Sequence, residues 1–190
     1  MKIAIFGGSF DPIHTGHAMM ANFLSGLPGI DQVWIMVSPR NPLKENGPVA
    51  DEAARLEMAR LVAEDCASAE VSDFETRLPV PSYTIDTLRA LRDAYPRHQF
   101  KWVIGSDNWE IISQWRESES ILREFGVLVY ERPGYPVTGQ LPQGVELIKD
   151  APLALISSTF IRQSIKESKN LNFFVPDKVL KYIEKHKLYQ

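Results

Sequence analysis

The sequence predicts an α/β protein built on an open parallel sheet, and three observations carry this prediction. Short apolar runs that lack a polar face recur along the chain, stretches of helical periodicity separate them, and the connections between them are short. Runs of that kind are typical of strands in the middle of a parallel sheet. Strands and helices that alternate in this way form right-handed βαβ units, so we expect helices on both faces of one open sheet.

Four runs rich in β-branched or aromatic residues give the strongest strand predictions, at residues 3–6, 33–37, 102–104 and 127–130. Helical periodicity between these runs predicts helices over residues 16–27, 51–65 and 83–95. In the second of these stretches the apolar residues recur at steps of three and four: Ala54, Met58, Leu61 and Val62. That helix therefore has an apolar face to lay against the sheet.

The C-terminal part of the sequence is less regular. Residues 131–150 carry three prolines and three glycines, which predict either a long surface excursion or a weak edge region. A helix is predicted over 158–167 and a second one over 177–186, with a proline-containing loop between them. We therefore expect a single domain over residues 1–190: a Rossmann-like open parallel sheet with helices on both faces and a small C-terminal helical portion, from about residue 157.

Length and composition narrow the class of protein. The 190 residues have room for one well-cored domain, and 44% apolar and 24% charged residues are ordinary globular values. A net charge of -3 offers no diffuse attraction to nucleic acid or to anionic membranes, so we expect neither as a partner. No apolar run is long enough for a signal peptide or a membrane span, and the single cysteine fits a reducing compartment. We expect a cytoplasmic protein whose oligomeric state is open, a homo-oligomer included.

The first predicted strand runs into the stretch GGSFDPIHTGH, residues 7–17. Gly7 and Gly8 let a ligand approach the backbone, and a helix opens at His14 or the next residue, where free N–H groups favour an anion. His14 and His17, three residues apart, can lie on the same side of that helix and stabilise charge on phosphoryl oxygens. The two histidines could instead cap or pack the helix. No nearby cysteine or third histidine completes a zinc site, so we expect no protein-bound metal.

Two commoner phosphate motifs are absent from the sequence, the P-loop G-x-x-x-x-G-K-[ST] and the dinucleotide fingerprint G-x-G-x-x-G. Their absence counts against P-loop ATPases and hydride-transfer dehydrogenases. Asp11 in the same stretch invites a metal-ligand interpretation, but an Asp-Pro turn explains it as well.

A second group of polar residues opens the predicted helix at 158–167, in the stretch ISSTFIR. Ser157, Ser158 and Thr159 offer consecutive hydroxyls, and Arg162 can return to the same end of the helix. Hydroxyls, backbone N–H groups and a guanidinium together favour an anion. Routine helix capping explains the hydroxyls equally well when this motif is taken alone.

Together, GGSFDPIHTGH and ISSTFIR resemble the nucleotidyltransferase superfamily of HxGH enzymes. Further stretches resemble the bacterial nicotinate-nucleotide adenylyltransferases over nearly the whole chain: PSYTIDTL, IGSD, the Trp115-Arg116 pair, ERPGYP and VPDKVLKYIEKHKLY. The resemblance implies transfer of AMP from ATP to nicotinate mononucleotide, which gives nicotinate adenine dinucleotide and pyrophosphate in NAD biosynthesis. It also implies Mg²⁺, which we expect to arrive with ATP on phosphate oxygens and water.

The resemblance also implies roles for individual residues. Catalytic contacts to the phosphates fall to His14, His17 and Arg162, with His17 closest to the α-phosphate. ATP binding falls to Gly7, Gly8, Ser9, Phe10, Lys44, Gly105, Asp107, Ser158 and Thr159. Binding of the acceptor nucleotide falls to Tyr83, Thr84, Trp115, Arg116 and Arg132. In this group the indole would stack on the pyridine ring and the helix start at residues 83–84 would receive the carboxylate, while Arg132 either approaches the acceptor phosphate or forms a salt bridge.

The implied chemistry suits these residue types. A phosphate monoester has a second pKa around 6, so the acceptor phosphate is ionised near neutral pH and needs no general base. The enzyme has to align two anions and offset charge in the transition state. Two alternatives remain: the same chemistry with nicotinamide mononucleotide or another phosphate-bearing acceptor, and a non-catalytic nucleotide sensor on this scaffold.

Overall fold

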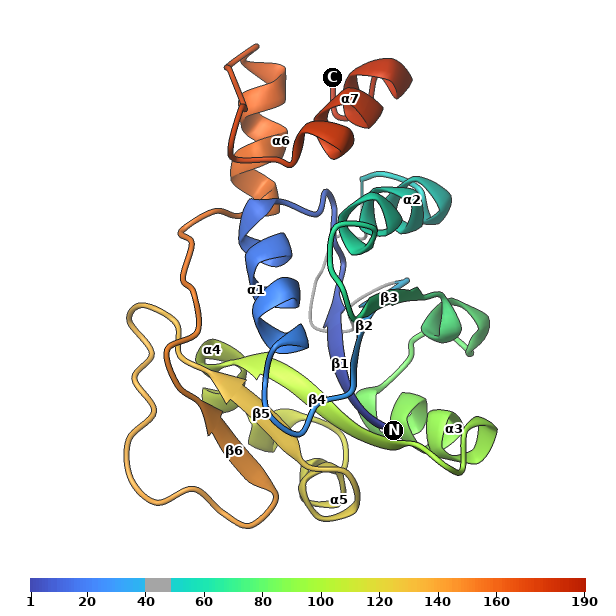
Figure 1. Ribbon diagram of the computed structural model, residues 1–190, viewed down its shortest axis with the longest axis vertical. Coiled ribbons are helices and arrows are strands. Elements are labelled where there is room, and N and C mark those ends of the chain that lie inside the picture. Colours follow the sequence, from blue (N-terminus) through green and yellow to red (C-terminus); the bar gives the residue numbers. More distant parts are fainter. Residues whose placement is uncertain (40–48) are drawn as a thin grey trace.

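The computed structural model describes residues 1–39 and 49–190, and within these ranges six strands pair in parallel in one sheet (Figure 1). The strands are β1 (Lys2–Gly8), β2 (Gln32–Val37), β3 (Ala69–Ser72), β4 (Gln99–Gly105), β5 (Val127–Tyr130) and β6 (Val145–Ile148). Their order in the sheet is β3-β2-β1-β4-β5-β6. The predicted open parallel sheet is therefore confirmed.

The helices of the described residues lie between and after these strands. They are α1 (Thr15–Ser25), α2 (Glu52–Ala63), α3 (Thr84–Ala94), α4 (Ser106–Glu110), α5 (Ser118–Glu124), α6 (Ser158–Lys166) and α7 (Asp177–His186). Two short 3₁₀ helices, η1 (Phe74–Arg77) and η2 (Ile112–Gln114), complete the described elements. All five predicted helices and all four predicted strands are present, with small differences at their ends.

Two strands and the shortest helices were not predicted from the sequence, and their position explains why. β3 and β6 are the two edge strands, each of four residues, and each carries an exposed glutamate, Glu70 or Glu146. An edge strand is half-covered, so its apolar signal is weak. Within residues 131–150 the sheet gains β6 as an edge, while the preceding residues make the surface excursion.

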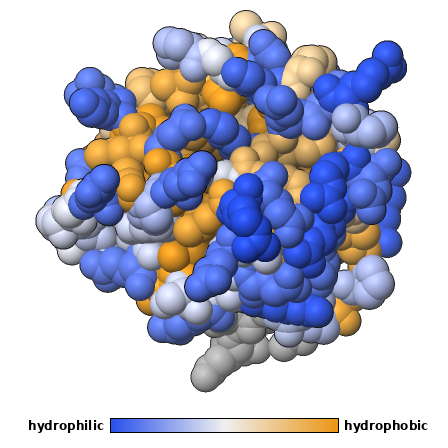
Figure 2. Space-filling view, turned by 90° about the horizontal axis from the view of Figure 1, so that it is seen from below, coloured by the Kyte–Doolittle hydropathy of each residue, from blue (hydrophilic) through white to orange (hydrophobic). Residues whose placement is uncertain are grey.

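Alternate residues of β1 serve two separate cores, one on each face of the sheet. Ala4 and Phe6 face a core shared with α1, α2, α6 and α7. Ile3 and Ile5 face the other core, shared with α3 and α5. Each large apolar side chain buried in this way contributes about 1.5–3 kcal/mol, which explains why β1 is apolar on both faces. Hydrophilic and hydrophobic residues intermingle on the end of the molecule opposite α6 and α7 (Figure 2).

The C-terminal helices pack against the start of α1 and against α2 (Figure 1). Lys178 of α7 forms ion pairs with Glu64 and Asp65 just after α2, at 3.1 and 2.7 Å. The hydroxyl of Thr15 donates to the carbonyl of Phe173, at 2.8 Å. These contacts fix the C-terminal portion beside the first helix.

The strand order changes direction between β1 and β4. From β1 the chain proceeds outward to β2 and β3, then crosses back to β4 on the other side. In open α/β sheets, ligands bind beyond the carboxyl ends of the strands at such a point. Gly7, Gly8 and Gly105 end these two strands, so a site is expected above them.

Candidate active site

The larger of two neighbouring cavities lies where α1 and α6 begin and has a volume of about 830 Å³. Figure 1 shows these two helix starts side by side, although about 140 residues separate them in the sequence. Among its lining residues are most of the predicted phosphate contacts: Ser9, His14, His17, Ser158, Thr159 and Arg162. The structure therefore brings the two predicted phosphate motifs together at one cavity.

Direct hydrogen bonds hold α6 against the loop before α1. The hydroxyl of Ser158 donates to the carbonyl of Pro12 at 2.9 Å, and Nη1 of Arg162 donates to the carbonyl of Asp11 at 2.7 Å. Nη2 of Arg162 donates to the hydroxyl of Thr159 at 3.2 Å. The guanidinium is thereby oriented at the wall of the larger cavity, with three-quarters of its side chain buried.

The two histidines of this cavity stack on each other, with ring centroids 3.6 Å apart. The backbone N–H of His14 donates to Nδ1 of His17 at 3.3 Å, so a neutral His17 carries its proton on Nε2. Burial, together with the positive charge of Arg132, lowers the pKa of His14 to about 4. At neutral pH His14 is therefore an uncharged ring, and the pair offers N–H donors to an anion.

Asp11 lines this cavity, although it is only 4% exposed, and its carboxylate already accepts hydrogen bonds. It accepts hydrogen bonds from the N–H groups of Val49 and Ala50 and from the hydroxyl of Tyr189. These contacts favour the turn interpretation of Asp11 over the metal-ligand one. Among the described residues, no group of three or more histidine, cysteine, aspartate or glutamate side chains is arranged to hold a metal.

The smaller cavity, of about 190 Å³, lies above the carboxyl ends of β1, β2 and β4. It contains four of the five residues predicted to bind the acceptor nucleotide: Tyr83, Thr84, Trp115 and Arg116. Gly7, Gly8 and Gly105, predicted on the ATP side, also line this cavity, and Ser9 lines both. The cavities share Phe6 and Tyr130 as well, so the two spaces adjoin.

Trp115 and the start of α3 both line the smaller cavity. Trp115 directly follows η2, and its Nε1 is buried without a hydrogen-bond partner among the described residues. Tyr83 is the N-cap of α3 and no side chain caps that helix, so its first N–H groups can receive an anion. Arg116 adds a positive charge, which Asp86 balances at 3.0 Å.

Gly7 is required by its contact with an aromatic ring. A Cβ at this position would lie 2.7 Å from the ring of Trp102, which also lines the smaller cavity. Gly105 is crowded in the same way, because a Cβ there would lie 2.6 Å from Cδ of Arg132. At both strand ends a side chain would therefore collide with a neighbouring side chain, which explains the glycines.

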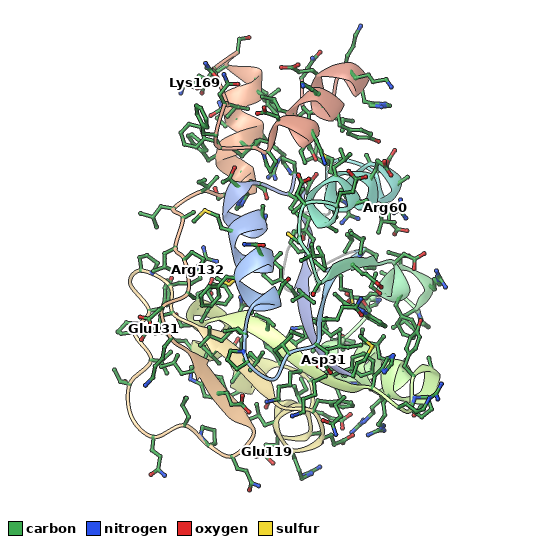
Figure 3. The ribbon with its side chains drawn as sticks, viewed as in Figure 1. Asp31, Arg60, Glu119, Glu131, Arg132 and Lys169 are labelled. Carbon is green, nitrogen blue, oxygen red and sulfur yellow. The ribbon has the colours of Figure 1, made fainter. Side chains whose placement is uncertain are left out.

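Three of the predicted site residues that the structure describes, Arg132, Asp107 and Phe10, also lie elsewhere than in the cavity expected for them. Arg132 lines the larger cavity rather than the smaller one, and its guanidinium pairs with Asp107 at 3.4 Å; Figure 3 shows it on the segment after β5, beside α1. Asp107 lines neither cavity, but its Oδ1 is buried and has no hydrogen-bond partner in the described part of the chain. Phe10 is a core residue under Gly8. Lys44 lies outside the described residues.

Sequence reasoning missed two buried charged residues at the site. Glu75 accepts hydrogen bonds from the hydroxyls of Ser38 and Ser82, at 2.9 and 2.7 Å, and all three line the smaller cavity. Burial raises the pKa of Glu75, against the two hydroxyl hydrogen bonds that lower it. Arg55 donates to the carbonyls of Ser9 and Ser38, at 2.8 and 2.7 Å, and so ties the ends of β1 and β2 together. The sequence did contain a signal for Arg55, because this charged residue lies on the otherwise apolar face of α2.

Comparison with known proteins identifies the class to which this fold and site belong. Residues 5–164 match the model of the family described as cytidylyltransferase-like, so the chain belongs to that family. A relative from Bacteroides fragilis, named a probable nicotinate-nucleotide adenylyltransferase, is 45% identical over 96% of this chain and 90% of its own length. A relative from Flavobacterium johnsoniae with the same name is 41% identical, and the match covers both chains fully. The predicted resemblance to bacterial nicotinate-nucleotide adenylyltransferases is thereby confirmed.

Solved structures agree on the fold. The nicotinic acid mononucleotide adenylyltransferase of Plasmodium falciparum, solved in complex with NaAD, matches with a TM-score of 0.84 and 24% sequence identity. The match covers 99% of this chain and 97% of the other. A structure of the same protein with APC matches with a TM-score of 0.81. None of the helices described here is long and apolar enough to span a lipid bilayer.

Proposed function

We propose that this protein transfers the adenylyl group of ATP to nicotinate mononucleotide, which yields nicotinate adenine dinucleotide and pyrophosphate. The observation that carries the proposal is the meeting of two unlike cavities: a larger one lined by the starts of α1 and α6, and a smaller one lined by the indole of Trp115 and the start of α3. The family and the names of the relatives support the same reaction.

The reaction requires the acceptor phosphate to meet the α-phosphorus of ATP at the boundary between the two cavities. Ser9, Phe6 and Tyr130 line both cavities and mark that boundary. In our proposal the phosphates of ATP lie between α1 and α6, with His14 and His17 on the α-phosphate and Ser158, Thr159 and Arg162 on the β- and γ-phosphates. Catalysis then consists of alignment and charge stabilisation, which needs no protein nucleophile.

On the acceptor side, we assign the pyridine ring to Trp115 and the carboxylate to the N–H groups at the start of α3. Tyr83 and Thr84 present that helix start, and Arg116 adds positive charge to it. Arg132 lies on the larger-cavity side, where it can reach the acceptor phosphate at the boundary. Asp107 has an unpartnered buried oxygen that suits a ribose hydroxyl of the adenosine.

Mg²⁺ belongs to the substrate in this proposal. The cation enters with ATP on phosphate oxygens and water, which is its usual way of binding in sites of this kind. The occupied carboxylate of Asp11 supports this assignment, because this acidic group of the loop before α1 already accepts three hydrogen bonds.

We place the protein in the cytoplasm, where its single cysteine, free and buried, would stay reduced.

Parallel assays of pyrophosphate release test the acceptor. With MgATP and the acid or the amide mononucleotide in separate reactions, we expect turnover of nicotinate mononucleotide to exceed that of nicotinamide mononucleotide. Equal or faster turnover of the amide would overturn the substrate assignment. The control is His17→Ala, which should lose at least about 10²-fold in kcat because a donor to the transition state is removed. Absence of turnover with every acceptor, together with nucleotide binding, would favour a non-catalytic sensor.

A further inference from the structure

Asp11 attaches the phosphate loop to three distant parts of the chain. Its carboxylate accepts hydrogen bonds from the N–H groups of Val49 and Ala50, at 2.7 and 3.1 Å, and from the hydroxyl of Tyr189, at 2.8 Å. Its carbonyl accepts from Nη1 of Arg162 at 2.7 Å, and the same nitrogen lies 3.8 Å from Oδ2. Asp11 is only 4% exposed, so water does not compete for these contacts.

The chain after α7 turns back to bring Tyr189 under this loop. Lys187 takes a left-handed conformation with φ of +52°, and the N–H of Leu188 donates to the carbonyl of Ile183 at 3.0 Å. Tyr189 also has a left-handed φ, +66°, and is 6% exposed. Non-glycine residues rarely adopt this conformation. The backbone thus takes two uncommon conformations within three residues to place one hydroxyl on a buried carboxylate.

We propose that Tyr189 is a positioning residue for the phosphate site: its hydroxyl holds the Asp11 carboxylate, and Asp11 in turn orients the Arg162 guanidinium through its carbonyl. The proposal rests on the proposed function, in which Arg162 binds the β- and γ-phosphates of ATP. Tyr189 lines neither of the two cavities, so it acts through Asp11 and Arg162 and does not touch the substrate.

The physical reason lies in what Asp11 would do without the hydroxyl. Among the described residues, Oδ1 would keep the N–H of Ala50 as its single donor, in a place shielded from water, and a buried carboxylate oxygen that loses a donor is destabilised unless it gains another. Arg162 is a positive group close to this carboxylate, with its Nη1 already 3.8 Å from Oδ2. A direct ion pair between the two would draw the guanidinium from the cavity wall. Burial and the Asp11 charge raise the pKa of Tyr189, so its hydroxyl remains a donor at neutral pH.

Tyr189→Phe tests the proposal because it removes only the hydroxyl. We expect kcat/KM for ATP to fall about tenfold, the scale of one lost hydrogen bond to a charged group, while KM for nicotinate mononucleotide stays within about twofold. Tyr182→Phe is the matched control, since this tyrosine of α7, the helix that precedes Tyr189, stacks on His186 and its replacement should leave both quantities unchanged. Equal changes in both kinetic quantities, or no change at all, would overturn the proposal.

Tyr189→Phe in an Arg162→Ala background shows whether the hydroxyl acts by positioning Arg162 or by a general effect on the stability of the site. Because Tyr189 acts through Arg162, its replacement should then cost less than about twofold in kcat/KM for ATP. A tenfold loss in both backgrounds would show that the hydroxyl acts independently of the guanidinium. Such a result would reject the mechanism.

Titration calorimetry with MgATP alone distinguishes this inference from the proposed function. Weaker ATP binding by Tyr189→Phe than by the wild type supports the positioning role, even if nicotinate mononucleotide proves not to be the acceptor. Unchanged ATP affinity in the variant overturns the positioning role, even if the acceptor is correct. The two proposals can therefore fail separately.

Discussion

At the scale of single residues, the neutral and buried state of His14 has a measurable consequence for stability. Its pKa is about 4 in the folded protein and 6.5 in the unfolded chain, and burial is the main cause. Below pH 6.5 His14 is therefore protonated in the unfolded chain, whereas in the folded protein it stays neutral down to about pH 4. The stability that comes from the neutral ring is full above pH 6.5 and is lost as the pH falls through this window.

We therefore expect His14→Gln to flatten the loss of stability on acidification. Between pH 7 and pH 4 the free energy of unfolding of the wild type should fall by up to about 3 kcal/mol more than that of the variant. Urea unfolding at a series of pH values measures this difference, and contributions shared by the two proteins cancel. His186→Gln, at an exposed position, is the matched control. Parallel curves for wild type and His14→Gln would contradict the assignment.

At the scale of elements, Glu75 connects three segments around the smaller cavity. It lies in η1, and it receives hydroxyl donors from Ser38 after β2 and Ser82 before α3. Its two carboxylate oxygens each hold one hydroxyl, an arrangement that an amide with a single acceptor oxygen cannot reproduce. Glu75 thereby fixes the position of the helix start to which we assign the nicotinate carboxylate.

Glu75→Gln should therefore affect the acceptor more than ATP. We expect KM for nicotinate mononucleotide to rise about five- to tenfold, KM for ATP to change less than about twofold, and unfolding to require about 1 kcal/mol less free energy. Steady-state kinetics with each substrate varied in turn gives both values. Glu110→Gln, exposed on α4, is the control. Equal increases in the two KM values would indicate a general loss of order instead.

The elements also show what the sequence could and could not predict. The central strands were predictable because burial on both faces leaves a continuous apolar run. The edge strands β3 and β6 were not, because their polar residues interrupt such a run. The two phosphate motifs were predictable because each is local. Glu75 and Tyr189 were not, because their roles depend on partners that lie 37 and 178 residues away in the sequence.

At the scale of the whole molecule, one core joins the sheet to the C-terminal helices. Phe6 of β1 belongs to the same buried cluster as Ile161 of α6 and Val179 and Ile183 of α7. A shared core of this kind favours cooperative unfolding, so we propose that residues 1–190 form one domain.

Thermal unfolding should then show a single transition that MgATP shifts upward. At a free ATP concentration of 100 times Kd, the added stability is about 2.7 kcal/mol, which corresponds to about 5–10 °C in Tm for a chain of this size. Calorimetry and circular dichroism should give the same midpoint. Two transitions, with only one of them sensitive to ATP, would contradict the single-domain assignment.

The attachment of the first loop to the last helices has a consequence for protein synthesis. A ribosome adds residues in sequence order, so Gly7, His14 and His17 emerge long before Ser158, Arg162 and Tyr189. A nascent chain that ends before α6 has the residues of the smaller cavity but lacks Ser158, Thr159 and Arg162, which we assign to the phosphates. In our proposal, competence to consume ATP therefore requires α6 and Tyr189 to have been translated, and chains that end before α6 lack it.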